Sequence, residues 1–480
     1  MTSIKKLFAP TDMTKGVPWK SIVAFTLPML IGNIAQQLYN TVDSIVVSHY
    51  IKDSADVIAA NINNPDFVKA GDRALSAVGS CGPILNMLLV LFIGISAGAS
   101  IMVSQYFGAK NRKSLSFTVG NCITVTAIAC VILIAVMTPL IRSLLVVLNT
   151  PASTLDWCCD YLTISLIGIM GMAYYNILSG IIRGLGDSFS ALLYLLVATI
   201  LNIILDIFFV ANLNMEVAGV ALATVIAQCV SSALCLWKLS RMTQFFDFKL
   251  SYLKPVGEYV MRIIKLGLPS GLTQAIFSSA MIIVQSLTNS FGELFIAANV
   301  VIMRVDGFAM MPNFSFGTAM TTYAGQNVGA GDYDRVSKGA KQGTLIAVGT
   351  SALITAIILL FGKPLMGVFT ETAELVDMSY YLMMILATGY IAMAVTQSLS
   401  GIMRGAGDTV TPMWVSLCTT VLARVPIAYG ISFLTRTPEL PHGRYECIQI
   451  SLLISWVLGA VLTAIFYARG KWKNKAITKQ

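Results

Sequence analysis

The stretch SGIIRGLGDS at residues 179–188 returns as SGIMRGAGDT at residues 400–409, after an interval of 221 residues. The same interval separates SQYFGAKN at 104–111 from GQNVGAGD at 325–332. Two matches at one interval indicate that the chain consists of two similar halves. The repeated Arg-Gly-x-Gly-Asp pattern predicts a tight turn with positive φ at glycine, followed by a helix that the aspartate caps.

The two halves differ in length near their beginnings. Leu-Pro at 27–28 returns at 268–269, an interval of 241 residues instead of 221, so the first half is 20 residues longer in this region. The polar stretch at 51–73 has no counterpart in the second half, and we interpret it as an insertion in an outer loop. Each proline removes a helical hydrogen bond and allows the helix to bend.

The composition is that of a membrane protein. Of the 480 residues, 56% are hydrophobic and only 11% are charged, whereas soluble domains are roughly 25% charged. Apolar segments long enough to cross ~30 Å of hydrocarbon recur from residue 21 to residue 468. We predict an all-α polytopic fold of twelve transmembrane helices in two six-helix lobes. Because six is even, a pseudo-twofold axis along the membrane normal should relate the lobes.

The distribution of charge predicts the orientation in the membrane. If both termini are cytoplasmic, 23 of the 32 Lys and Arg residues lie in cytoplasmic segments and 7 in outer ones, as the positive-inside rule requires. The net charge of +9 is therefore a topology signal and does not indicate nucleic-acid binding. The predicted parts are a cytoplasmic tail at 1–20, an N-lobe at 21–237 with the outer insertion 51–73, a cytoplasmic linker at 238–258, a C-lobe at 259–468 and a basic cytoplasmic tail at 469–480.

Ionisable residues inside the predicted spans are the strongest functional signal, because a charge at membrane depth is costly. In the N-lobe, Asp43 and Asp206 fall at similar depth in the membrane. Asn202 lies one turn before Asp206 on the same span, and Thr224 lies on the next span. Carboxylate, amide and hydroxyl oxygens suit a hard cation such as Na⁺. Two carboxyl groups in a poorly solvated pocket equally suit a proton. A structural alternative is that these groups only tie helices together.

The C-lobe does not repeat this acidic cluster. Its buried charges are predicted to be Arg304, Asp306 and Arg424. Arg304 and Asp306 are two residues apart and face different sides of one helix, so we expect Asp306 to form a buried ion pair with Arg424. Cysteine and histidine show no metal-binding spacing, and neither a metal centre nor an enzyme active-site motif is expected apart from the possible Na⁺ site.

These features together resemble the multidrug and toxic compound extrusion (MATE) family. The resemblance covers the whole chain: Leu-Pro in spans 1 and 7, Gln-x-x-Gly-Ala after spans 2 and 8, and Arg-Gly-x-Gly-Asp after spans 4 and 10. It implies a V-shaped fold. By position it implies a cation site at Asp43, Asn202, Asp206 and Thr224, and a substrate cavity that includes Gln36, Tyr39 and Asn176. Spans 7 and 10 contain no acid, which resembles the DNA-damage-inducible (DinF-like) branch.

The expected function is that of a secondary active antiporter in the plasma membrane. It would export cationic or amphipathic small molecules in exchange for inward Na⁺ or H⁺ by alternating access, coupled through Asp43 and Asp206. No cofactor beyond the coupling ion, no nucleic acid and no partner besides substrate and lipid is expected, and we predict a monomer. The alternative is a flippase for a lipid-linked precursor, which would favour a broad cationic cavity and additional spans. A membrane-embedded enzyme is the least favoured hypothesis.

Overall fold

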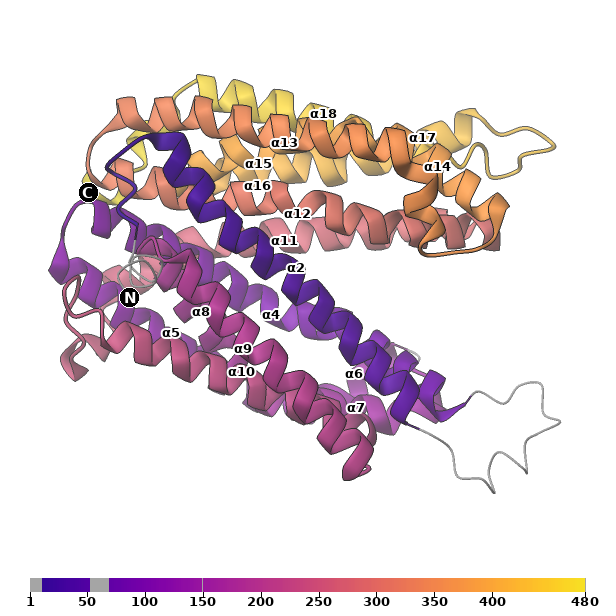
Figure 1. Cartoon of the computed structure of the whole chain (residues 1–480), viewed down its shortest axis with the longest axis horizontal. Helices are drawn as coiled ribbons and strands as arrows, with labels where there is room; N and C mark the ends of the chain where they lie inside the picture. The colour runs from indigo at the N-terminus through magenta and orange to yellow at the C-terminus, as the bar shows by residue number, and fades with distance from the viewer. Residues whose placement is uncertain (1–10, 52–68, 149, 480) are drawn as a thin grey trace.

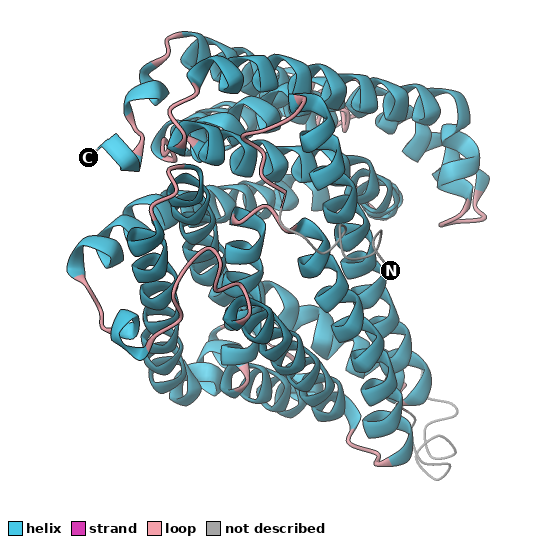
Figure 2. Cartoon of the chain, turned by 60° about the vertical axis from the view of Figure 1, so that its left-hand side comes forward, coloured by secondary structure: helices cyan, strands magenta, loops and turns pink. Residues whose placement is uncertain are grey.

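The computed structural model describes residues 11–51, 69–148 and 150–479. This part of the chain is helical, with one isolated β-bridge between Thr437 and Leu440 (Figure 2). Ten helices are long and apolar enough to span a membrane, and two further spans result if each of two bent helix pairs counts as one. The predicted all-α polytopic fold is therefore confirmed for the described residues.

The described residues of the first half form eight α-helices, which are long enough to span a membrane either alone or in combination. They are α2 (Pro18–Tyr50), α4 (Ala70–Gly108), α5 (Arg112–Met137), which continues through η1 (Thr138–Leu140) into α6 (Ile141–Val147), α7 (Ala152–Ile167), α8 (Ile169–Gly184), α9 (Ser188–Ile207), which ends in the π-helical segment η2 (Phe208–Asn212), and α10 (Glu216–Ser240).

The second half repeats this order after a connection that contains η3 (Leu250–Leu253). Its elements are α11 (Gly257–Asn289), α12 (Glu293–Gly329), α13 (Tyr333–Gly367), α14 (Ala373–Ala387), α15 (Gly389–Gly405), α16 (Val410–Ser416), the π-helical segment η4 (Leu417–Ala423), α17 (Arg424–Leu434), α18 (Cys447–Ala468), η5 (Lys471–Asn474) and η6 (Ile477–Lys479). The bends also correspond, since α7 and α8 meet at 48° and α14 and α15 at 44°.

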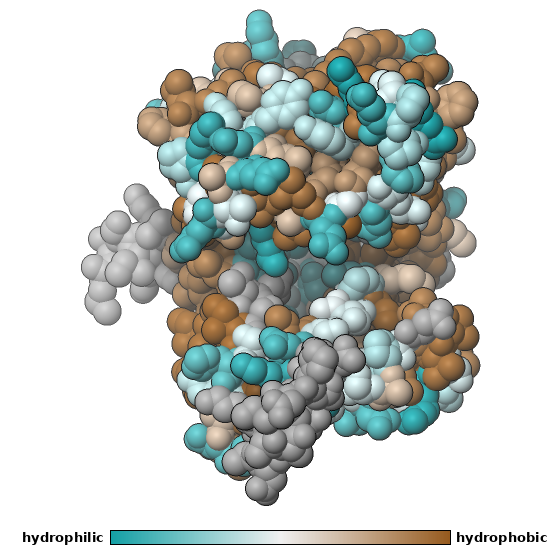
Figure 3. All heavy atoms as spheres, turned by 90° about the vertical axis from the view of Figure 1, so that its right-hand side faces the viewer, coloured by the Kyte–Doolittle hydropathy of each residue, from teal (hydrophilic) through white to brown (hydrophobic). Residues whose placement is uncertain are grey.

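The helices form two bundles that touch at one end and diverge toward the other (Figure 1). The described residues nearest the two termini lie at the closed end. Viewed from the opposite end, the molecule has a hollow between the bundles (Figure 3). The first helix of each half lies at the seam: α2 packs against α9 but also against α12 and α13, and α11 packs more against α4 than against any other helix.

The repeated Arg-Gly-x-Gly-Asp turns have the geometry that their sequence predicts. Gly186 has φ +91° and Gly407 has φ +98°, which is a conformation that side chains with Cβ rarely adopt. Asp187 then accepts a hydrogen bond from the backbone nitrogen of Ser190 at 2.9 Å and caps α9. In the second half, Asp408 accepts from Thr411 at 3.2 Å in the same way.

At the closed end the backbones of α4 and α12 cross in direct contact. A Cβ atom added to Gly108 would lie 1.8 Å from the carbonyl oxygen of Gln326, and one added to Gly329 would lie 2.0 Å from that of Gln105. Only glycine fits such a crossing. These four residues belong to the second repeated motif, which explains why the motif returns in both halves.

The glutamines of this motif each reach into the opposite half. Gln105 donates through Nε2 to the carbonyl oxygen of Gly405 at 2.8 Å, and Gln326 donates to that of Gly184 at 3.1 Å. Both acceptors lie in the repeated Arg-Gly turns. The two duplicated motifs therefore hold the closed end together through symmetry-related hydrogen bonds.

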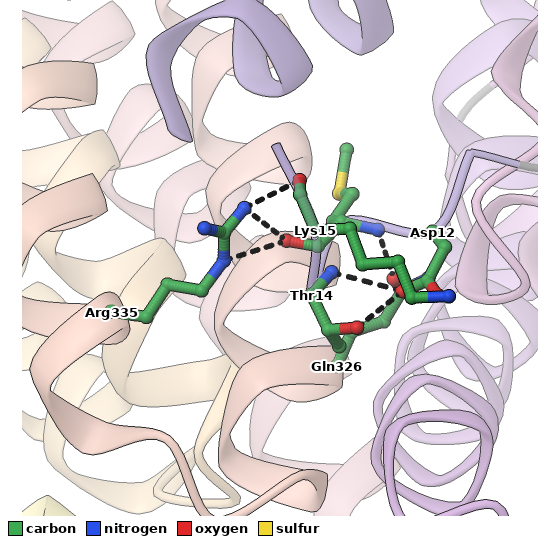
Figure 4. Close-up of polar contacts among 6 residues, drawn as sticks. Asp12, Thr14, Lys15, Gln326 and Arg335 are labelled. Atoms are coloured by element: carbon green, nitrogen blue, oxygen red, sulfur yellow. Dashed lines mark hydrogen bonds and ion pairs between the residues drawn. The ribbon is translucent and has the colours of Figure 1, made fainter. Parts of the chain in front are cut away.

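Residues just inside the two termini complete the closed end. The side-chain oxygen of Gln326 accepts a hydrogen bond from the backbone nitrogen of Met13 at 2.9 Å. That of Gln105 accepts from the backbone nitrogen of Ile477 at 2.8 Å. Arg335 of α13 donates to the carbonyl oxygens of Met13, Lys15 and Gly16 (Figure 4). The N-terminal segment is thus fastened to the second half before α2 begins.

Candidate functional site

A cavity of about 600 Å³ lies in the N-terminal bundle. Its wall is formed by side chains of α2, α4, α8, α9 and α10, and it includes Gln36, Asp43, Asn176 and Thr224. The sequence-predicted residues of α2, α8 and α10 thus share one cavity. The side chain of Tyr39, which was also predicted to line it, lies outside the described residues.

The four predicted cation-site residues come together at one side of this cavity. With its amide in the orientation that satisfies its neighbours, Asn202 donates to Asp43 Oδ1 at 2.9 Å and to Asp206 Oδ2 at 3.0 Å. Its oxygen then accepts from the backbone nitrogen of Thr224 at 3.3 Å. The amide therefore bridges two carboxyl groups and three helices, α2, α9 and α10.

Asp206 is fully buried, as is Asn202. The Oδ1 atom of Asp206 has no hydrogen-bond partner among the described residues. The amide nitrogen of Asn202 holds the carboxyl groups of Asp206 and Asp43 beside each other. Two bare negative charges so close together in a buried site repel each other, and a proton or a cation bound between them removes this repulsion. The cluster can therefore take up one positive charge.

Sequence reasoning missed two polar residues that line the same cavity as Asp43. One is Tyr161 of α7. The other is Gln228 of α10, whose side-chain oxygen has no hydrogen-bond partner among the described residues. One helical turn separates Gln228 from Thr224, so its position on the same face could have been found from the sequence.

A second cavity, also of about 600 Å³, lies between the two bundles. It is lined by α4 and α8 on one side and by α11, α12, α15, α17 and α18 on the other, and it shares Asn176, Arg183 and Thr318 with the first cavity. Asp306 and Arg424 both face this second cavity. The C-lobe charges therefore border a space in which a ligand fits.

The expected ion pair between Asp306 and Arg424 is not formed. Among the described residues, Asp306 accepts a hydrogen bond from Tyr390 Oη at 2.9 Å, and no ion pair joins it to an arginine. The rotation of Arg424 is set by the π-helical segment η4 that precedes it, and one extra residue per turn rotates the following side chains by roughly 100°. Such a segment is not visible in the helical spacing of the sequence.

The prediction that Arg304 is buried is wrong. Its side chain is exposed on α12 and does not line either cavity. Its neighbour two residues later, Asp306, faces the cavity, so Arg304 points away from it, as the helical period requires. The described residues contain no group of three His, Cys, Asp or Glu side chains that could hold a metal ion.

A bundle of ten to twelve membrane-spanning helices around cavities that reach between two halves defines a multi-pass membrane transporter. Residues 67–208 and 269–430 match the family model MatE. The chain therefore belongs to this family of transporters, whose members are not enzymes. The two matched segments fall in the two halves that the internal repeat defines.

Relatives of known name are similar over nearly the whole chain. A probable multidrug resistance protein, YoeA, of Bacillus subtilis is 26% identical over 470 residues, 96% of each chain. A probable multidrug resistance protein, NorM, of Thermotoga maritima is 23% identical over 95% of this chain and 94% of its own.

Solved structures share the fold. A multidrug resistance MATE transporter in its outward-facing conformation superposes with a TM-score of 0.84 at 24% identity, over 95% of this chain and 97% of that one. A transporter of the same superfamily from Pyrococcus furiosus, described as having a binding pocket of reverse polarity that suggests a different function, gives 0.83 at 23% identity, over 96% and 97%.

Proposed function

We propose that this transporter exports amphipathic or cationic small molecules in exchange for an inward-moving Na⁺ or H⁺. The observation that carries the proposal is the bridging of Asp43 and Asp206 by Asn202 beside the N-lobe cavity. A site that accepts one positive charge can use the membrane potential, which supplies ~2.3 kcal/mol per charge and 100 mV. The names of the relatives, which are multidrug resistance proteins, support export as the direction.

Alternating access would use the arrangement of the two halves. We propose that residues 21–237 and 259–468 rock against each other, joined by the linker 238–258, with both termini in the cytoplasm and the insertion 51–73 outside. The positive-inside distribution supports this orientation. The closed end would then face the cytoplasm, and the hollow between the bundles would open outward. A monomer is sufficient for this cycle.

Uptake of a cation by the acidic cluster offers a physical basis for coupling. Asp43 is on α2, which packs against α9 of its own bundle and against α12 and α13 of the other. When a positive charge removes the repulsion between Asp43 and Asp206, α2 and α9 gain a tighter contact at this point. Because α2 lies at the seam, its position is expected to favour one of the two conformations.

The coupling proposal is tested with purified protein in liposomes. An imposed inward Na⁺ or H⁺ gradient, each at clamped potential, should drive accumulation or release of a fluorescent amphiphile, tested once with a cation such as ethidium and once with an anion such as dansylglycine. Asp43→Asn and Asp206→Asn should each abolish the response to the gradient, while Asp156→Asn, an exposed residue, should leave it unchanged. Gradient-driven transport at the wild-type rate in both cluster variants would refute the coupling role.

The flippase hypothesis has one observation in its favour. Arginines line the cavity between the bundles, and a lipid-linked precursor with a phosphate head group would require such a cationic wall. The additional spans that this hypothesis favours are absent from the described part of the chain. A scrambling assay with a fluorescent phospholipid in the same liposomes separates flipping from export of a water-soluble molecule.

A further inference from the structure

Three arginine side chains face the cavity between the bundles: Arg183, Arg404 and Arg424. Within the described residues, none of them forms a hydrogen bond or an ion pair with another residue. The cavity has one carboxylate, Asp306, and its hydrogen bond goes to Tyr390 instead. The wall therefore has an excess of positive charge without protein partners.

Arg424 is the most informative of the three. Only 7% of the residue is exposed, and its buried Nε atom has no hydrogen-bond partner in the part of the chain that the structure describes. A guanidinium keeps its proton and has five donors to satisfy. Holding it in this position without an acceptor is unfavourable, and a bound ligand would supply the acceptor. The residue begins α17 directly after the π-helical segment η4, and such segments frequently occur at functional sites.

The other two arginines reach the same space from opposite sides. Arg183 is in the last turn of α8 and Arg404 in the last turn of α15, at equivalent positions of the repeat. One belongs to each bundle. A ligand between the bundles would therefore meet positive charge on both walls, at the floor of the cavity near the closed end.

The remaining wall suits the apolar body of a ligand. It combines flexible and aromatic apolar side chains, which adapt to varied shapes, with a few amides that can orient polar groups. The apolar residues include Phe277, Phe314, Met310, Met393 and Trp456, and the amides include Gln274 and Gln397. With a volume of about 600 Å³, the cavity accommodates a drug-sized molecule.

We propose that this cavity binds amphipathic organic anions, whose carboxylate, sulfonate or phosphate group is held by Arg424, while Arg183 and Arg404 add positive charge nearer the closed end. Arginine matches these groups because its planar fork donates two parallel hydrogen bonds to their oxygens. The inference rests on the proposed export function and names its substrate class. The acidic cluster for the coupling ion lies in the other cavity, so the two charges of opposite sign have separate sites.

The first experiment uses the wild-type protein in phosphatidylcholine nanodiscs and two probes with the same fluorophore. Dansylglycine carries a carboxylate and dansylcholine a quaternary ammonium group, so their difference reports on charge. We expect dansylglycine to bind at least about tenfold more tightly, as one good charge-assisted hydrogen bond would give. Equal binding, or a preference for dansylcholine, would overturn the proposal without any mutation.

The second experiment uses variants to test whether an arginine side chain holds the anionic group of the probe. Arg424→Gln should weaken dansylglycine binding about 10- to 100-fold and leave dansylcholine unchanged or slightly improved. Arg404→Gln should have a smaller effect, because Arg404 lies nearer the closed end. The control is Arg304→Gln, since this arginine is exposed and outside the cavity. Unchanged dansylglycine binding in Arg424→Gln would contradict the assignment. If Arg424→Gln does not fold, Arg424→Lys decides the question: wild-type affinity would contradict the assignment, because lysine cannot donate the two parallel hydrogen bonds.

Two further comparisons complete the test. Adding phosphatidylglycerol to the nanodiscs should leave dansylglycine binding intact if the ligand is a small molecule, and should displace it if an acidic lipid head group is the natural occupant. Failure of the anion assignment would leave gradient-driven transport and its loss in Asp43→Asn intact. Failure of the coupling proposal would instead leave the preference for dansylglycine intact.

Discussion

At the scale of single residues, the two cavities differ in the way their charges are satisfied. The N-lobe carboxyl groups share the amide of Asn202, whereas the arginines of the other cavity form no hydrogen bond or ion pair with the other described residues. Asn202 is fully buried and joins α2, α9 and α10, of which α2 and α9 would otherwise repel each other through Asp43 and Asp206. The amide is therefore as important to the site as the acids.

Replacement of this amide should destabilise the protein. Asn202→Ala leaves the two carboxyl groups without their shared donor, and a buried group that loses its partner costs about 1–3 kcal/mol. A lower midpoint of thermal unfolding is expected, measured in detergent by tryptophan fluorescence. Thr199→Ala on the same helix is the control, because the Thr199 hydroxyl bonds only to the carbonyl oxygen of Leu195. Equal midpoints for the two variants would show that the amide bridge contributes little.

The acidic site could be predicted from the sequence, and the cationic one could not. Asp43 and Asp206 stand out because a carboxylate within an apolar span has few structural reasons to be there. Arg183 and Arg404 fall at the ends of predicted spans, where the positive-inside rule already accounts for arginine. Their orientation toward the cavity depends on how α8 and α15 pack in three dimensions. The position of Arg424 depends on η4, which has no sequence signature.

At the scale of helices, the repeat is explained by contacts between the halves. The same three-residue spacing, from Gln105 to Gly108 and from Gln326 to Gly329, produces one crossing of α4 and α12. The sequence predicts that these motifs recur, but their structural role depends on contacts with the other half of the chain. Each glycine leaves room for the backbone of the other half, and each glutamine donates a hydrogen bond to the Arg-Gly turn of the other half.

The crossing predicts that alanine substitutions at two glycines of α4 have very different effects on stability. Gly108→Ala would place a Cβ atom against the Gln326 backbone, which cannot move as a flexible side chain would, so α4 and α12 must separate. Overpacking of this kind costs about 1–3 kcal/mol or more. Gly79→Ala is the matched control, because no atom lies within 4 Å of its added Cβ.

The effect is read from the accessibility of a cysteine introduced at the closed end and from the unfolding midpoint. Gly108→Ala should raise the labelling rate and lower the midpoint, while Gly79→Ala should change neither. If the two variants behave alike, the direct backbone contact between the halves is not essential to the closed state.

At the scale of the whole molecule, the segment before α2 (residues 13–16) links the two halves at the closed end; we call this segment the clasp. Residues 13–16 precede a helix that packs on the first bundle, yet they are bound by Arg335 of the second (Figure 4). Met13 is fully buried in a cluster with Phe316, Met320 and other side chains of α12. The closed state is therefore stabilised by contacts that must break before the bundles can part at this end.

Removing the clasp should shift the conformational equilibrium toward the state that is open at the end with the termini. Arg335→Ala deletes the donors to three carbonyl oxygens, and hydrogen bonds to a charged group contribute about 1.5–3 kcal/mol, which corresponds to a 10- to 100-fold change in population. Spin labels placed on the ends of α8 and α15 should report longer distances in Arg335→Ala. Lys338→Ala, an exposed position on the same helix, should keep the wild-type distances.

The same change should affect the binding rate. Because substrate must enter from this side if it is cytoplasmic, Arg335→Ala should also bind dansylglycine added to that face faster. Unchanged distances in Arg335→Ala would mean that the glycine crossing alone keeps the bundles together.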